Sequence, residues 1–225
     1  MNWVNIDVNA RSGGMGHSQV ASDEGLSSVH YNPASIVFIG DTQLYGSYSE
    51  YFGGMTYSTM AYGARLSSSE FFALHIFSMS SDDIAITTEY HPDGTGEFFQ
   101  MKGICFRGTY AKAMTDRLKL GISFKYLKES IYTHNMTAVA FDMGVNFKIV
   151  NELLLGFSMT NFGPAVDFGS NSFYNTSLNR RFYLPKQIRL GIENSFPIDK
   201  QNQMIFAFDV MNTINDTVAK NIGVE

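Results

Sequence analysis

The chain has 225 residues, enough for one large β domain or two small domains, and we expect one. Charged residues make up 16% and aromatic residues 14% of the chain, a mixture that excludes a disordered protein. The net charge of -5, without a run of Lys or Arg, argues against nucleic acid as a partner. The single cysteine, Cys105, excludes an intrachain disulfide and a CxxC metal knuckle.

The chain begins with a glycine-rich stretch, RSGGMGHSQVASDEGLSSVHYNPA (residues 11–34), ahead of any strand pattern. Gly13, Gly14 and Gly16 are compatible with a phosphate-binding loop. Such loops need a preceding strand and a following helix, and a P-loop also ends in Gly-Lys-Ser/Thr. His17-Ser18 stands where that ending would need Lys, so we expect no nucleotide and no cofactor.

From about residue 43 onward, apolar residues recur at every second position, which is typical of strands with one apolar face. In LKLGISFKYL (residues 118–127) that face carries Leu118, Leu120, Ile122, Phe124 and Tyr126. Gly and polar residues interrupt the pattern. We therefore predict one antiparallel meander with strands near 43–51, 55–66, 70–88, 97–113, 117–134, 137–149, 152–162, 186–196 and 203–212, and a tenth beginning near 220.

Alternation alone does not separate a soluble β-sandwich from a membrane barrel, but three features favour the barrel. Segments 97–113 and 117–134 exceed the roughly 5–6 residues of soluble strands, as tilted membrane strands must. The longest break, 163–185, falls on the side where outer loops are expected. The polar face combines small glycines, as a crowded lumen requires, with charged candidates for the lumen: Arg107, Lys125, Asp142, Arg189, Glu193 and Asp209.

Aromatic residues near the strand ends fit a girdle at the membrane interface, although strands favour aromatic residues in any setting. The residues concerned are Tyr48, Tyr51, Tyr57, Tyr62, Tyr110, Tyr132 and Phe162.

No residue pattern indicates catalysis or metal binding. The five His residues lie in separate segments without ligand spacing. Asp82-Asp83 and Asp93-Gly94-Thr95-Gly96 lack the spacing and terminal Glu of a calcium loop. There is no GxSxG nucleophile elbow. We expect neither a metal site nor an enzyme, although a hydrolase with a dyad on a strand would show no local motif.

The N-terminal stretch resembles the start of the mature PorV/PorQ family, a branch of the FadL-like outer-membrane barrels. In that family a segment of the form A-R-x-x-G-M-G, then A-x-x-D, then Y/W-N-P-A precedes the first strand. The matching residues are Ala10, Arg11, Gly14, Met15, Gly16, Ala21, Asp23, Tyr31, Asn32, Pro33 and Ala34. Four further blocks follow in the family's order, so the resemblance covers nearly the whole chain: LKLGISFKYLKESI, FDMGVNFKI, LLLGFSMTNFGPAVDF and LPKQIRLGIE.

This resemblance implies an all-β fold, an antiparallel transmembrane β-barrel of FadL-like type, with residues 1–42 as an N-terminal plug and 43–225 as the barrel. About ten of roughly 14 strands are present and no signal peptide is recognised, so we expect a fragment. Asn-Pro favours an extended Asn32 and a change of direction, and glycines permit close packing. A strap packed against the wall is the alternative to a plug or gate formed by Arg11, Gly14, Met15, Gly16, Asp23, Asn32, Pro33 and Ala34.

The resemblance further implies a location in the outer membrane and a role in type IX protein secretion, in which cargo with a C-terminal signal reaches the cell surface. Lipid, secretion-system components and cargo would then be the partners. The alternative is a FadL-like transporter of hydrophobic small molecules, for which Ser80 to Asp83 offer a kink in segment 70–88. An outer-membrane enzyme or a soluble sandwich adhesin forms the third class.

Overall fold

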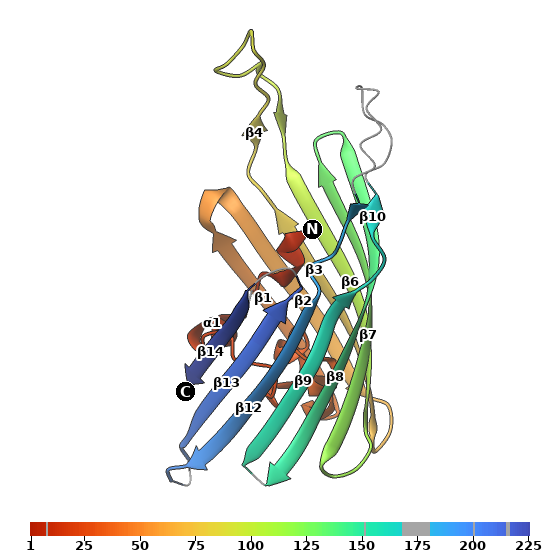
Figure 1. Cartoon of the computed structure of the whole chain (residues 1–225), viewed down its shortest axis with the longest axis vertical. Coiled ribbons are helices and arrows are strands. Elements are labelled where there is room, and N and C mark those ends of the chain that lie inside the picture. The colour runs from red at the N-terminus through yellow and green to blue at the C-terminus, as the bar shows by residue number, and fades with distance from the viewer. Residues whose placement is uncertain (8, 151, 168–180, 200, 215–216) are drawn as a thin grey trace.

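The structure, a computed structural model, describes residues 1–7, 9–150, 152–167, 181–199, 201–214 and 217–225. In this part of the chain ten strands form one antiparallel sheet, and their order in the sheet is their order in the sequence (Figure 1). The predicted ten-stranded meander is therefore confirmed. The strands are β1 (Thr42–Tyr51), β2 (Met55–Arg65), β3 (Glu70–Ser80), β6 (Met101–Ala113), β7 (Leu118–Ile131), β8 (His134–Val150), β9 (Leu153–Phe162), β12 (Gln187–Pro197), β13 (Gln203–Thr213) and β14 (Val218–Val224).

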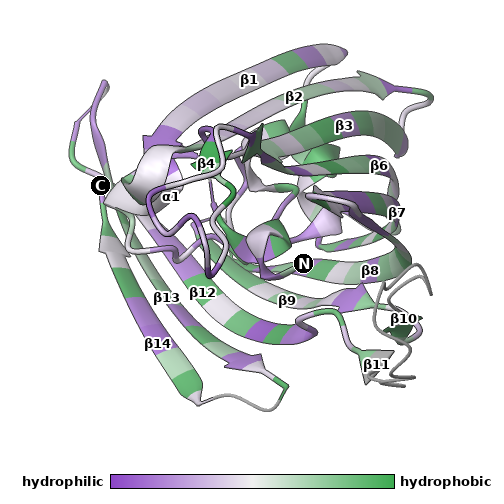
Figure 2. Ribbon diagram, turned by 90° about the horizontal axis from the view of Figure 1, so that it is seen from above, coloured by the Kyte–Doolittle hydropathy of each residue, from purple (hydrophilic) through white to green (hydrophobic). Residues whose placement is uncertain are grey.

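The sheet curls around the first 41 residues, here called the N-terminal segment, as the view from above shows (Figure 2). Its edges are β1 and β14, and no ladder joins these two strands among the described residues. The longest ladder pairs β7 with β8, from Leu118 opposite Phe147 to Ile131 opposite His134. Long ladders of this kind position the inner face of the sheet as one continuous surface.

The predicted strand 70–88 is wrong in its second half, because β3 ends at Ser80. Its ladder with β6 stops at the pair Ser80 and Lys102. The chain then forms a separate hairpin from β4 (Ile84–Ala85) and β5 (Phe98–Phe99), which projects beyond the sheet (Figure 1). A hydrogen bond from Ile86 N to Glu97 O (2.9 Å) continues this hairpin, so these extended residues pair with each other rather than with the wall.

A second small hairpin lies within the break predicted at 163–185. It pairs β10 (Val166–Asp167) with β11 (Arg181–Phe182). Residues 168–180, the greater part of the predicted outer loop, lie outside the described residues.

The N-terminal segment contains four short helical turns: η1 (Asn2–Asn5), α1 (Ala10–Gly14), η2 (Gly25–Ser28) and η3 (Pro33–Phe38). Asn32 is extended, with φ -149° and ψ 114°, and its side chain accepts a hydrogen bond from Ala34 N (3.0 Å). Proline directly after such a cap has a fixed φ that suits the first helical position, so Asn-Pro starts η3. In the described chain, none of the helices is long and apolar enough to cross a membrane.

Burial is reversed relative to a water-soluble sheet, as the strand β7 shows. Ile122 is 57% exposed and points outward with Phe124, whereas Lys125 is 1% exposed and Ser123 is buried. A soluble sandwich would bury the apolar face instead, so the apolar face found here on the outside favours a barrel wall. Of the predicted girdle, Tyr57 is an exception because it faces inward, where it stacks on Phe77 with ring centroids 6.1 Å apart.

The apolar core lies inside the curl, between the sheet and the N-terminal segment. Trp3 packs on Phe77 of β3, with ring centroids 5.5 Å apart. A second cluster joins Leu26 and Ile36 of the segment to Phe71 at the start of β3. Burial of such side chains stabilises by about 1.5–3 kcal/mol each, which holds the segment against the wall.

Candidate functional site

Strand glycines on the inner face lie under the backbone of the N-terminal segment. A Cβ atom at Gly121 would overlap the backbone of Ala34, and one at Gly144 would overlap the side chain of Asn32. One at Gly156 would likewise overlap the backbone of Val20. The sequence analysis explained these glycines by crowding inside a curved sheet. The structure gives a second reason, since only strands without side chains at these positions let the segment approach so closely.

Asn32 connects the segment to the wall and is fully buried. Its Nδ2 donates to Val20 O (2.7 Å) within the segment and to Val145 O (3.0 Å) on β8. Its Oδ1 accepts a hydrogen bond from Ala34 N, so the Asn32 amide satisfies backbone groups of both the N-terminal segment and the wall. Pro33 and Ala34 are buried beside it.

Asp209 of β13, one of the predicted lumen residues, contacts the segment directly. Its Oδ2 accepts hydrogen bonds from Gln19 N (2.8 Å) and Val20 N (3.0 Å). Charged acceptors make the stronger class of hydrogen bond. A carboxylate on the wall therefore satisfies two backbone donors of the segment at once.

The residues of the A-R-x-x-G-M-G spacing lie in different surroundings. Arg11 donates from Nε to Glu225 Oε2 (2.8 Å) and from Nη1 to Gln19 Oε1 (3.2 Å). Met15 is buried against Ile205 and Ala207 of β13. Gly16 has φ +57°, and a Cβ there would lie 2.6 Å from Ile222 O.

Two predicted plug residues do not contribute to close packing. Gly14 is exposed, and a Cβ atom there would meet nothing within 4 Å. Asp23 is also exposed. Close packing, which glycines were expected to permit, is therefore present at Gly16 and absent at Gly14.

Three of the predicted lumen residues form one buried ionic cluster. Lys125 Nζ lies 2.7 Å from Asp142 Oδ2, and Arg107 Nε lies 3.9 Å from the same oxygen. Asn161, which the sequence did not single out, joins them: its Oδ1 accepts from Lys125 Nζ (2.7 Å) and its N donates to Asp142 Oδ1 (2.8 Å). Asn161 has φ +62°, a conformation that Asn adopts more readily than most residues. Glu193 is buried elsewhere, on β12.

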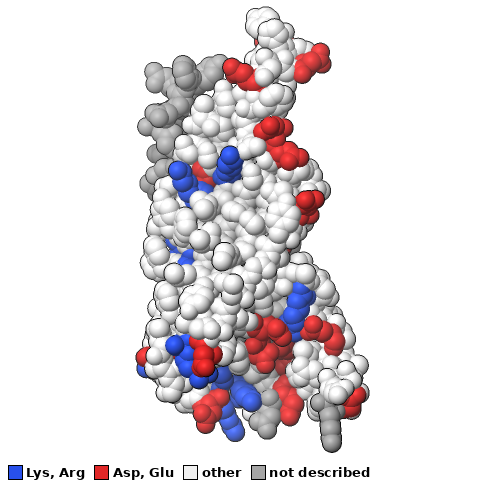
Figure 3. Space-filling view, turned by 180° about the vertical axis from the view of Figure 1, so that it is seen from behind, with Lys and Arg blue, Asp and Glu red and all other residues white. Residues whose placement is uncertain are grey.

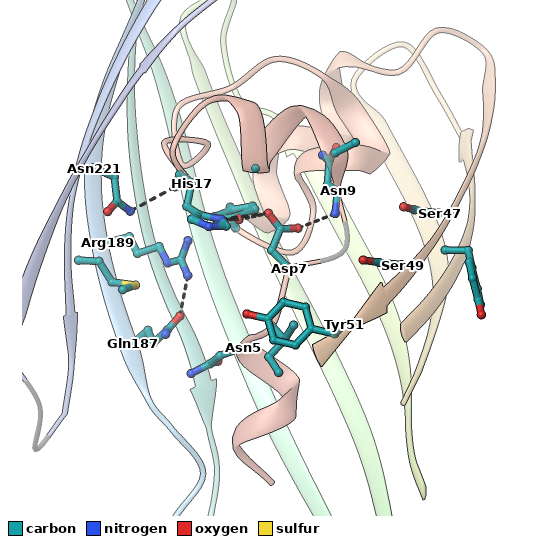
Figure 4. A pocket seen from close by; sticks show the side chains of 16 residues that line it. Asn5, Asp7, Asn9, His17, Ser47, Ser49, Tyr51, Gln187, Arg189 and Asn221 are labelled. Carbon is teal, nitrogen blue, oxygen red and sulfur yellow. Dashed lines mark hydrogen bonds and ion pairs between the residues drawn. The ribbon is translucent and has the colours of Figure 1, made fainter. Parts of the chain in front are cut away.

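A cavity of about 570 Å³ lies between the N-terminal segment, β1 and strands β12 to β14 (Figure 4). Arg189 is the predicted lumen residue that lines it. Its guanidinium stacks 4.4 Å from the ring centroid of Tyr31, and its Nη2 donates to Gln187 Oε1 (2.9 Å). Polar residues otherwise dominate the labelled lining: Asn5, Asp7, Asn9, His17, Ser47, Ser49, Gln187 and Asn221.

Asp7, His17 and Tyr31 meet at one wall of this cavity, and the sequence analysis missed the group. The Tyr31 hydroxyl donates to Asp7 Oδ2, and His17 Nδ1 lies 3.4 Å from the same oxygen. Burial alone would raise the pKa of Asp7, but the hydrogen bonds from His17 and its neighbours lower that pKa to about 2. The bond to Asp7 raises the pKa of His17, and burial raises the pKa of Tyr31. No sequence spacing reveals this group, because His17 and Tyr31 lie 10 and 24 positions from Asp7.

Within the described ranges, no group of three or more His, Cys, Asp or Glu side chains is placed to hold a metal ion. Cys105 is a free, buried thiol. The interior offers hydrogen-bonding and charged groups beside its apolar clusters.

No protein-family model and no curated protein matches the chain. Among solved structures it is similar to the toluene transporter TodX of Pseudomonas putida, with 15% identity, a TM-score of 0.59, and coverage of 96% of this chain and 75% of that one. It is also similar to the toluene transporter TbuX of Ralstonia pickettii, with 12% identity, a TM-score of 0.55, and coverage of 96% of this chain and 77% of that one. A deletion mutant of the TodX monoaromatic hydrocarbon channel is similar with 15% identity, a TM-score of 0.58, and coverage of 97% of this chain and 75% of that one. The curled sheet with its inner N-terminal segment is thus the FadL-like fold.

Proposed function

We propose that the protein is a FadL-like outer-membrane barrel that passes hydrophobic small molecules, with the N-terminal segment as its plug. The reversed burial carries this proposal, because an apolar outer face with charged strand residues such as Arg107, Lys125 and Asp142 buried on the inside suits a wall surrounded by lipid. The names of the similar structures, toluene transporters and a monoaromatic hydrocarbon channel, support a hydrophobic passenger. They are transporters and channels rather than enzymes, in agreement with the expectation of a non-enzymatic protein.

The test is uptake of radiolabelled toluene at low concentration by cells that lack the gene. We expect slower uptake than in the parent strain and recovery on complementation with the full gene. Uptake of a sugar that uses another porin is the control and stays unchanged. Equal toluene uptake in the presence and absence of the gene contradicts the proposal.

A role in type IX secretion is the second candidate, and the position of the resembling residues supports it. Gly16, Asn32 and Pro33, all part of the PorV/PorQ-like spacing, are among the residues that lie close to the wall. Loss of surface display of C-terminal-signal cargo in the deletion strain, with normal toluene uptake, would favour secretion. Normal display with impaired uptake would reject it.

A further inference from the structure

We propose that the hairpin of residues 82–99, which contains β4 and β5, binds a second protein that presents Lys and Arg side chains beside an apolar patch. This inference goes beyond the passage of small molecules. It rests on the proposed function only in placing the sheet in a membrane, with the hairpin outside it.

The hairpin is supported at its base by two neighbouring turns. Asp82 N donates to Gly54 O (2.9 Å) in the turn between β1 and β2. On the other arm, the ring of Phe99 packs on Tyr132 in the turn between β7 and β8, with ring centroids 5.6 Å apart. The hairpin therefore projects from the sheet in a supported position (Figure 1), which lowers the entropy that a partner must remove on binding.

The hairpin exposes large aromatic side chains. Tyr90, in the turn between Thr88 and His91, is 86% exposed, and Phe98 on β5 is 60% exposed. On the wall, lipid would cover such side chains, but the hairpin lies beyond the sheet (Figure 1). Exposed apolar surface in water marks interaction sites, and aromatic residues are enriched where proteins meet.

The charge of the hairpin decides which kind of partner fits these aromatic residues. Residues 82–99 contain no Lys or Arg and five acidic residues: Asp82, Asp83, Glu89, Asp93 and Glu97. In the described part of the chain, none of the five forms an ion pair. Figure 3 shows the projecting tip with Asp and Glu and without Lys or Arg. A basic surface is complementary to this potential and is steered toward it.

The same charge disfavours the other candidate occupants. Phosphate-bearing lipid head groups carry the same sign of charge as the hairpin. Two copies of this chain, side by side in one membrane, would bring like charges together. Arg117 and Lys148 of another copy could not reach the hairpin, because they lie at the opposite end of the strands, where Lys148 N donates to Arg117 O (2.8 Å). A different protein with a basic surface is therefore the occupant that fits.

The experiment places the photo-crosslinking residue p-benzoylphenylalanine at position 90 in cells that express the full gene. We expect a crosslink to one protein, at a peptide that mass spectrometry shows to be rich in Lys and Arg. Removing three charges should lower the crosslink yield by about tenfold, in a triple variant with Glu89→Gln, Asp93→Asn and Glu97→Gln. A crosslinked protein supports the proposal only together with this charge dependence.

The matched control removes three acids from turns at the opposite end of the strands and leaves the yield unchanged: Asp116→Asn, Glu152→Gln and Asp199→Asn. Phe98→Ser keeps every charge and should lower the yield by about threefold, because it removes an aromatic contact. Heat-modifiable gel migration shows whether each variant is folded.

A second measurement uses the purified protein in detergent micelles and a lysine-rich peptide with a single tryptophan. This peptide should bind about tenfold more tightly than its counterpart with Glu in place of Lys, and added salt should weaken it. The proposal is overturned if position 90 crosslinks to lipid, to another copy or to nothing, if the two triple variants give equal yields, or if the two peptides bind equally well. Crosslinking does not depend on transport, so this proposal and the toluene-uptake test of the proposed function can fail independently.

Discussion

At the scale of single residues, Gly144 shows what the inner face requires. Its missing side chain leaves room for Asn32, and we expect Gly144→Ala to displace the N-terminal segment and destabilise the protein by about 1–3 kcal/mol. The control is Gly108→Ala on β6, where a Cβ would meet nothing within 4 Å. Urea unfolding in micelles measures both. Equal midpoints for the two variants would show that the segment does not depend on this close approach.

The pair of His17 and Asp7 gives a prediction for pH. Because the folded pKa of His17 is raised above 6.5 by Asp7, its contribution to stability is complete below pH 6.5 and is lost as pH rises through the folded value. The pKa of Asp7 is lowered from 3.8 to about 2, so its contribution is present above pH 3.8 and is lost as pH falls toward 2. An NMR titration of the His17 ring checks this. Asp7→Asn should lower the pKa of His17, and an unchanged value would contradict the assignment.

At the scale of elements, the attachment of the N-terminal segment to β13 is open to a direct test. Asp209→Ala leaves the amides of Gln19 and Val20 without their acceptor, and each lost partner costs about 1–3 kcal/mol. We expect faster hydrogen exchange at these two amides, with the strand ladders unaffected. Asp199→Ala, in the exposed turn between β12 and β13, is the control. Exchange that stays as slow as in the wild type would mean that other contacts alone hold the segment.

The strands were predictable from sequence and the elements around them were not, for physical reasons. Alternation reports the two faces of a strand directly, so segment 117–134 anticipated β7 closely. The same alternation continues past Ser80, because the strands β4 and β5 of the small hairpin are also extended. Only the end of the ladder between β3 and β6 separates this hairpin from the wall. Local residue patterns do not record which ladder a strand belongs to.

At the scale of the whole molecule, the position of the N-terminal segment depends on contacts that no local pattern reveals. Gln19 meets Asp209, 190 positions away, and Asn32 meets Val145, 113 positions away. Both Asn32 and Asp209 were singled out beforehand, but their partners were not. Figure 3 shows the rear face with Lys, Arg, Asp and Glu gathered mainly toward the two ends and few across the middle, as a wall in contact with lipid requires.

This outer band with few charges gives the last prediction, which compares Ile→Arg substitutions at two positions. Ile122 lies on the outer face of β7 and Ile84 lies in the hairpin beyond the sheet. If the band contacts lipid, Ile122→Arg places a charge in hydrocarbon and costs about 2–4 kcal/mol near the bilayer midplane. Ile84→Arg places the same charge in water and costs little. Urea unfolding from lipid vesicles measures the difference in free energy of unfolding between the two variants. This difference should vanish when neither lipid nor detergent contacts the outer face of β7. Equal stabilities in vesicles would mean that the apolar side of β7 does not face lipid, and the barrel interpretation would fail with it.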